Sequence, residues 1–194
     1  MGKTAKRERN MKAENRQLLL KIASDAIFQA LEFPGRKLPK PETVPEGLKE
    51  KRATFVTLTI GGRLRGCIGM LEACRPLAED VAENARAAAF DDPRFPPLTK
   101  KEFEKLEIHI SVLSPSEEIN FSSEADLLRQ IRRGEDGLIL QEGFRRGTFL
   151  PSVWEELPEK ELFWAHLKLK AGLPASYWSE TLRVFRYTTE YFPS

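Results

Sequence analysis

Cysteine and histidine are scarce in this chain of 194 residues, which has two of each. Cys67 and Cys74 are seven positions apart, and His109 and His166 are distant from them in sequence. Structural zinc sites do not have this spacing, so the sequence predicts no metal site and no bound cofactor. The chain is long enough to form a core without disulfides, and we expect both cysteines to be free thiols in a reducing compartment.

Long hydrophobic runs are absent as well. No apolar run reaches the ~20 residues that a membrane-spanning helix needs. The basic amino terminus is not followed by the apolar stretch of a signal peptide. Glycine-rich phosphate loops of the Rossmann or Walker type are also absent. These absences predict a cytoplasmic protein without a membrane anchor, and they argue against nucleotide binding through such loops.

The net charge is small, at +2, but it is unevenly distributed. Residues 1–16 carry six basic and two acidic side chains, so the rest of the chain has a slight acidic excess. This distribution predicts a basic, disordered tail over residues 1–14, followed by a single domain over residues 15–194 that could consist of two lobes. A basic tail can contact nucleic acid, but a solvated arm is the commoner outcome, so a nucleic-acid-associated regulator is the least supported function.

The apolar periodicities predict helices and strands that alternate without a regular βαβ rhythm. Such a mixture predicts an α+β fold with a mainly antiparallel sheet flanked by helices. A proline-rich connection over residues 34–50 is predicted to be irregular. The predicted helices cover residues 15–31, 76–90, 123–133 and 159–171, with a short helix after a capping box at Thr99, and the predicted strands cover residues 55–60, 64–69, 107–113, 137–141, 146–150 and 182–192.

The helix predicted over residues 159–171 has many apolar side chains. Its pattern predicts that one histidine is packed in the core with its apolar neighbours. The side chains predicted to be buried are Leu162, Phe163, His166, Leu167 and Leu169.

Residues 64–69, with the sequence LRGCIG, follow an apolar β-branched run and a Gly-Gly turn. They are therefore predicted to form the second strand of a β-hairpin. Alternation places Leu64 and every second residue after it on a core face, and Arg65, Cys67 and Gly69 on the opposite face. Glycine inside a strand often marks a close approach to the backbone. The opposite face therefore offers a cation and a thiol beside backbone that a ligand can reach.

A second strand, over residues 107–113, adds candidate residues. Alternation directs Glu107, His109 and Ser111 away from the core. If this strand lies in the same sheet as Cys67, one face holds a thiol, a base and an orienting carboxylate. The alternatives are a solvent-facing strand residue for His109 and a small buried hydrophobe for Cys67.

Arg94 lies in a loop that is stiffened by prolines on either side. A guanidinium held in a rigid loop can bind a carboxylate or phosphate through two hydrogen bonds with little reorganisation. The alternative is a structural arginine that donates to carbonyl groups of its own loop.

Residues 64–69 resemble the LRGCIG signature of the AMMECR-one family. Further segments resemble motifs of the same family and occur in the same order, so the resemblance spans roughly residues 55–192. It implies two lobes of unequal size with a cleft near the signature. The other matching segments are residues 90–98 (FDDPRFPPL), 110–115 (ISVLSP), 150–153 (LPSV) and 170–173 (KAGL).

The biochemical activity of the family is not established, but the resemblance implies partners. Prokaryotic members look like partners of Memo dioxygenase-like proteins and of radical-SAM enzymes in one shared system. Our main hypothesis is an accessory protein that works with such partners through the cleft around Arg65 and Cys67. The alternative is a small thiol-dependent enzyme that acts on a small molecule, with Cys67 as nucleophile or redox group. The candidate residues are Cys67 and His109 for catalysis, and Arg65, Gly66, Gly69, Arg94, Glu107 and Ser111 for binding.

Overall fold

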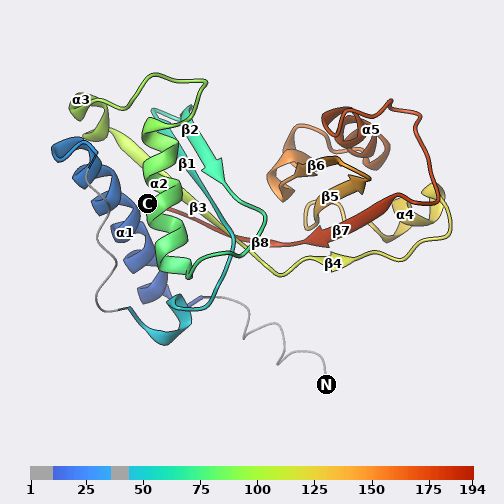
Figure 1. The fold of residues 1–194 in the computed structure, drawn as a ribbon, viewed down its shortest axis with the longest axis horizontal. Helices are drawn as coiled ribbons and strands as arrows, with labels where there is room; N and C mark the ends of the chain where they lie inside the picture. The colour runs from blue at the N-terminus through green and yellow to red at the C-terminus, as the bar shows by residue number, and fades with distance from the viewer. Residues whose placement is uncertain (1–10, 36–43) are drawn as a thin grey trace. The chain divides into compact units, whose positions relative to one another are not determined.

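The structure, a computed structural model, describes residues 11–35 and 44–194. Residues 1–10 of the predicted tail and residues 36–43 of the predicted proline-rich connection lie outside the described residues. The chain divides into two compact units. The first extends to Leu113 and includes Glu190–Ser194, and the second is Ser114–Thr189. Each unit has its own four-stranded sheet and its own helices (Figure 1), so the predicted α+β class with a mainly antiparallel sheet flanked by helices is confirmed, with one such sheet in each unit.

The sheet of the first unit contains the predicted hairpin. β1 (Thr54–Ile60) pairs antiparallel with both β2 (Arg63–Gly69) and β3 (Leu106–Leu113). The sheet order is β2-β1-β3-β8, where β8 is Thr189–Pro193, so β2 is an edge strand. The hairpin turns at Gly61 and Gly62, which both have positive φ, a conformation that glycine adopts without a steric penalty.

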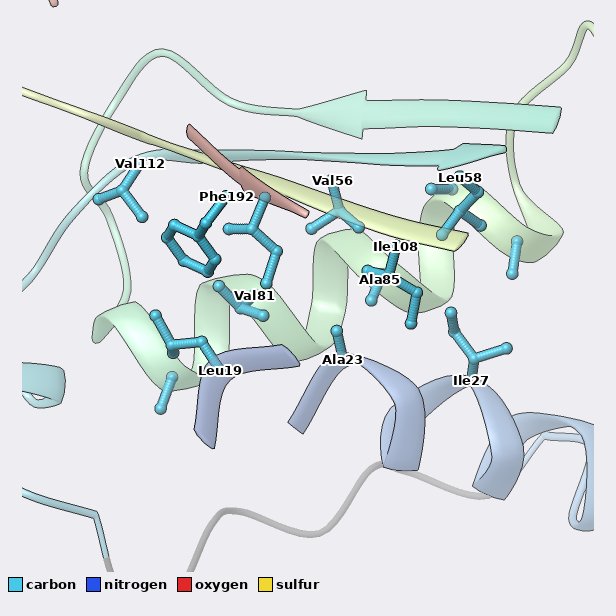
Figure 2. Close-up of a cluster of buried hydrophobic side chains, with 14 of the residues drawn as sticks. Leu19, Ala23, Ile27, Val56, Leu58, Val81, Ala85, Ile108, Val112 and Phe192 are labelled. Atoms are coloured by element: carbon cyan, nitrogen blue, oxygen red, sulfur yellow. The ribbon is translucent and has the colours of Figure 1, made fainter. Parts of the chain in front are cut away.

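One side of this sheet is covered by the long helices α1 (Ala13–Glu32) and α2 (Leu77–Phe90). The sheet contributes its alternate, apolar residues, and alanines on the helices allow close packing. α1 begins within the residues predicted to be tail, where the Met11 N–H donates to the Glu190 carboxylate at 2.9 Å. Figure 2 shows the side chains of helices and strands meeting in one cluster: Leu19, Ala23, Ile27, Val56, Leu58, Val81, Ala85, Ile108, Val112 and Phe192.

Short helices complete the first unit. The capping box predicted at Thr99 is present, and it opens α3 (Lys100–Phe103). The Thr99 side chain accepts the Glu102 N–H, while the Glu102 carboxylate accepts the Thr99 N–H at 2.9 Å. A single 3-10 turn, η1 (Glu46–Leu48), lies in the described part of the proline-rich connection and buries Leu48.

The second unit packs its helices against the predicted hairpin of β5 (Gly137–Glu142) and β6 (Arg145–Phe149). Its sheet order is β4-β7-β5-β6. Phe163 is fully buried and stacks on Trp154 with ring centroids 3.7 Å apart. The remaining elements are β4 (Glu117–Glu118), α4 (Glu124–Gln130), η2 (Pro151–Glu155), α5 (Lys160–Lys170) and β7 (Arg183–Tyr187).

The single strand predicted over residues 182–192 is wrong. The structure has β7 in the sheet of the second unit and β8 in the sheet of the first, separated at Thr188. The alternation of aromatic and polar residues continues through the break, so the pattern did not indicate it.

The helix predicted over residues 123–133 ends early, at Gln130. Ile131 is extended and buried, and the Asp136 carboxylate accepts the Arg132 N–H at 2.8 Å. The burial of Ile131 and the hydrogen bond of the Arg132 N–H therefore stabilise a non-helical conformation in place of the last predicted turn.

Three burial predictions in α5 are wrong, because Leu162, His166 and Leu169 are exposed. The larger rings of Phe163 and Trp164 determine which side of the helix faces the core. Lys168 is buried on that side, where its ammonium donates to Glu124 at 2.7 Å. In the described part of the chain, no helix is long and apolar enough to cross a membrane.

Candidate functional site

A β-bulge changes which residues of the 64–69 segment share a face. Gly66 pairs with Leu58, but the next pair is Leu64 with Thr59, so Arg65 is an extra residue on β2. Leu64 therefore lies on the same face as Cys67. The predicted alternation is wrong at Leu64 and Arg65, because it assumed a regular strand.

Arg65 is buried, with 8% of its surface exposed. Its Nε donates to Glu102 Oε1 and its Nη2 donates to the Pro96 carbonyl, both at 2.8 Å. The hydrogen bond from Arg65 lowers the pKa of Glu102 to about 2, although burial acts in the opposite direction. Among the described residues, Nη1 of Arg65 has no hydrogen-bond partner. Most of this guanidinium is therefore used to attach β2 to α3 and to the loop that precedes it.

Asp92 binds the edge of β2 at Cys67. Its buried carboxylate accepts the Cys67 N–H at 2.9 Å and Arg94 Nη2 at 2.7 Å. Arg94 Nη2 also lies 3.3 Å from the Cys67 carbonyl, to which it donates. The Arg94 side chain, with help from the Cys67 N–H, holds the pKa of Asp92 well below its usual range. Asp92 and Arg94 thus satisfy the backbone groups that an edge strand would otherwise leave unpaired.

Gly66 and Gly69 both lie against the protein's own backbone. A Cβ at Gly66 would lie 2.1 Å from the Ala88 carbonyl oxygen of α2. A Cβ at Gly69 would lie 2.4 Å from the Thr54 carbonyl oxygen. The close approach expected at these glycines is therefore present, and in the structure it is made by neighbouring elements.

The side of the first sheet away from α1 and α2 carries polar side chains. We call it the polar face, and its members come from β1, β2, β3 and β8. Cys67 pairs with Thr57, and Thr57 pairs with His109, so these three form one row across the strands. Ser111 lies on the same face, opposite Phe55. The polar face includes Phe55, Thr57, Thr59, Leu64, Cys67, Glu107, His109, Ser111 and Tyr191.

The thiol and the imidazole do not form a catalytic pair in this arrangement. They lie on strands separated by β1, and two strand spacings amount to about 10 Å. The Cys67 Sγ instead lies 3.2 Å from the Thr57 hydroxyl. Thr57 therefore occupies the position that a general base would need.

His109 is held from both sides by hydrogen bonds. The Thr59 hydroxyl donates to Glu107 at 2.7 Å and lies 2.9 Å from His109 Nε2. Because that hydroxyl has a single proton, its oxygen accepts from Nε2–H, and in a neutral imidazole Nδ1 then accepts from the Tyr191 hydroxyl at 2.7 Å. The result is a directional chain from Tyr191 through His109 and Thr59 to Glu107.

Comparison with known proteins identifies the family. The AMMECR1 family model matches residues 20–192. The chain belongs to the AMMECR1 family. A protein of Methanothermobacter thermautotrophicus is 39% identical over 176 residues, which cover 90% of this chain and 91% of the relative. Protein MJ0810 of Methanocaldococcus jannaschii is 42% identical over 155 residues, which cover 78% and 77% of the two chains.

A solved structure has the same fold. The crystal structure of the uncharacterized protein PH0010 from Pyrococcus horikoshii matches with a TM-score of 0.87 at 37% identity. The match covers 95% of this chain and 93% of that chain. The names of these AMMECR1 relatives state no activity, so the site has to be interpreted from its own chemistry.

Sequence reasoning missed several members of the polar face in this AMMECR1 protein. Thr57 and Thr59 alternate with apolar residues in β1, so strand periodicity could have placed them beside Cys67. Tyr191 had no such signal, because it lies in the half of the last predicted strand that joins a different sheet. No group of three or more potential metal ligands occurs among the described residues.

Proposed function

We propose that this protein is a binding component that works with Memo-type and radical-SAM enzymes in the cytoplasm and contacts a partner through its polar face. The observation that supports this most is the arrangement of Cys67 and His109. Each group already has hydrogen-bond partners on the face, and they do not contact each other. An ordered polar surface of this kind suits recognition, because little conformational freedom remains to be lost on binding.

The same arrangement favours binding over thiol chemistry. A catalytic thiol needs a base within about 3 Å, or another way of stabilising its anion. The Cys67 thiol lies beside the Thr57 hydroxyl, and the buried carboxylate nearby, Asp92, is engaged with the Cys67 N–H. Arg65, predicted as the cation of the site, has its guanidinium in contact with Glu102 and Pro96.

The exposed members of the polar face suggest the chemistry of the contact. Leu64 and Tyr191 are exposed and offer apolar surface with one hydroxyl group. Glu107 adds an exposed carboxylate. Such a surface suits a protein partner that brings an apolar side chain and a hydrogen-bond donor or cation, and aromatic groups with polar tips are frequent in such contacts. The family resemblance supports Memo-type and radical-SAM proteins as the partners to test.

Binding to a purified Memo-type or radical-SAM protein from the same organism tests the proposal. We expect Leu64→Glu and Tyr191→Ala each to weaken binding by about 10-fold or more, because central aromatic and apolar contacts dominate interfaces. Both side chains are exposed, so the thermal midpoint should be retained. Phe28→Glu, a change at an exposed apolar residue of α1, is the matched control and should bind normally.

Two results would contradict the proposal. The first is wild-type affinity in both polar-face variants. The second is a Cys67→Ala variant that binds its partner normally but abolishes the activity of the reconstituted pair, since that result would favour the thiol-dependent enzyme.

A further inference from the structure

Helix α5 has two apolar stripes, and one of them faces away from the core of its unit. The inner stripe contains Phe163, Trp164 and Leu167, all buried. On the outer side, Leu162 is 50% exposed and Leu169 is 54% exposed. Surface helices of globular proteins normally carry polar residues on that side. Exposed leucines on this side of the helix are therefore candidates for a contact with another molecule.

The outer stripe has the spacing of a helix-packing seam. Leu162 and Leu169 are seven residues apart, the repeat that keeps side chains on one side of a helix over two turns. Ala165 and His166 lie between them, and the small alanine leaves room for another helix to approach closely. The outer stripe, defined as Leu162, Ala165, His166 and Leu169, thus runs along most of the helix.

The two ends of the outer stripe carry opposite charge. Glu159 and Glu161 lie at its amino end, where Lys160 between them donates to the Leu128 carbonyl at 2.9 Å, so this end has a net negative charge. Lys170 lies at its carboxyl end, with its ammonium over the Phe149 ring. The Arg145 guanidinium donates to the Gly172 carbonyl, so it adds positive charge beside Lys170. A second helix that fits this stripe must therefore present positive charge at one end and negative charge at the other.

We propose that the outer stripe binds the same stripe of a second copy of this chain, with the two α5 helices antiparallel around a two-fold axis. In this arrangement Leu162 of each copy faces Leu169 of the other, and the axis passes between Ala165 and His166. The acidic end of each helix then meets the basic end of its neighbour. Antiparallel helices also place opposite ends of their macrodipoles together. A two-fold contact uses the same surface of both copies, so that surface must be complementary to itself. The opposite charges at the two ends of the stripe meet this requirement.

The small size of the contact limits the strength of the proposed dimer. An α-helix of 11 residues is about 16 Å long. Such a helix pair buries less than the roughly 1,200–2,000 Å² of a standard stable interface. The dimer is therefore weak, with a dissociation constant of about 1–100 µM.

Sedimentation velocity of the full chain from about 1 µM to about 1 mM tests the dimer, a range that spans the expected dissociation constant. The wild type is expected to shift with concentration from 22.2 kDa to twice that mass. The double variant Leu162→Glu, Leu169→Glu should dimerise at least 10-fold more weakly, with an unchanged thermal midpoint because both side chains are exposed. Phe28→Glu on α1, an equally exposed apolar residue, is the control and should dimerise like the wild type.

A charge exchange tests the antiparallel arrangement itself. Glu159→Lys with Glu161→Lys makes both ends of the stripe basic, and Lys170→Glu makes its carboxyl end less basic. Each variant alone should dimerise more weakly than the wild type, and an equal mixture of the two should form heterodimers. Three results would overturn the proposal: a wild type that stays monomeric to the highest concentration, a Leu162→Glu, Leu169→Glu variant that dimerises normally, or a mixture no more dimeric than its separate variants.

Discussion

Gly66 and Asp92 show how single residues hold the edge strand β2 against the first unit. Gly66 admits the Ala88 carbonyl of α2, and Asp92 accepts the Cys67 N–H. The sequence indicated that glycine within this strand has a purpose, because glycine weakens strands. It did not indicate the partners, because Ala88 and Asp92 are distant from β2 in the sequence and only the fold brings them together.

Gly66→Ala should destabilise the protein, since its Cβ would lie 2.1 Å from the Ala88 carbonyl oxygen. Neither the Cβ on β2 nor the carbonyl group on α2 can rotate away from the contact, so one of the two elements must shift. We expect this shift to lower the free energy of unfolding by about 1–3 kcal/mol. Urea denaturation measures this loss. Gly47→Ala is the matched control, because its Cβ would meet an atom only at 3.9 Å. Equal stability of the two variants would show that β2 can move without cost.

Asp92→Asn should remove about 1–3 kcal/mol at pH 7, because it breaks the ion pair between the buried Asp92 carboxylate and the exposed Arg94 guanidinium and weakens a charged hydrogen bond from the Cys67 N–H. The pKa of Asp92 is lowered in the folded protein. Its stabilisation is therefore fully present above the unfolded pKa of about 3.9 and is lost as the pH falls through the lower folded pKa. The difference between variant and wild type in urea denaturation should thus shrink at low pH.

The neighbouring residue supplies the control for this prediction. Asp91 also pairs with an arginine, Arg86, at 2.7 Å, but its side chain is 52% exposed, against 2% for Asp92. Exposed ion pairs contribute less than about 1 kcal/mol. Asp91→Asn should therefore change stability little, and a loss as large as that of Asp92→Asn would show that burial of Asp92 is not the cause.

The elements whose signals are local were predicted well. The capping box at Thr99, the Gly-Gly turn of the first hairpin and the strand over residues 107–113 all depend on neighbouring residues, and all are present. Predictions failed where a contact with a residue distant in the sequence determines the local structure. The bulge at Arg65 depends on Glu102 and Pro96, which hold the extra residue.

The wrong burial predictions for the outer stripe of α5 have a different cause. Periodicity correctly found apolar residues on that helix, but it could not decide which of two stripes faces the core. The rings of Phe163 and Trp164 settle the question through packing. Leu162 and Leu169, predicted to be buried, are therefore the residues that carry the proposed contact with a second copy.

At the scale of the whole molecule, residues 11–35 and 44–194 form two separate hydrophobic cores. One is formed by α1, α2 and the first sheet, and the other contains Phe163, Trp154 and Leu138 in the second unit. Buried clusters of this kind usually correspond to cooperative folding units. The two units are therefore expected to respond separately to a mutation in one core.

Phe163→Ala should destabilise the second unit by about 3–5 kcal/mol, because it leaves a cavity between Trp154 and Phe149. Hydrogen exchange measured by mass spectrometry should show lost protection in residues 114–189, with protection retained in β1 and α2. Val56→Ala, in the core of the first unit, should give the reverse pattern. A uniform loss of protection in both variants would show that the two cores unfold as one.

The chain leaves the first unit after β3 and returns to it at β8, and these two strands are neighbours in the sheet. The two crossing points lie together, since the Ser114 N–H donates to the Thr188 carbonyl at 2.8 Å. For the first sheet, the whole second unit is thus an insertion into a β-hairpin. The entropy of closing a loop grows only slowly with its length. The second unit can therefore gain or lose segments during evolution at little cost to the sheet that carries the polar face, and a designer could exchange it for another domain whose ends are equally close.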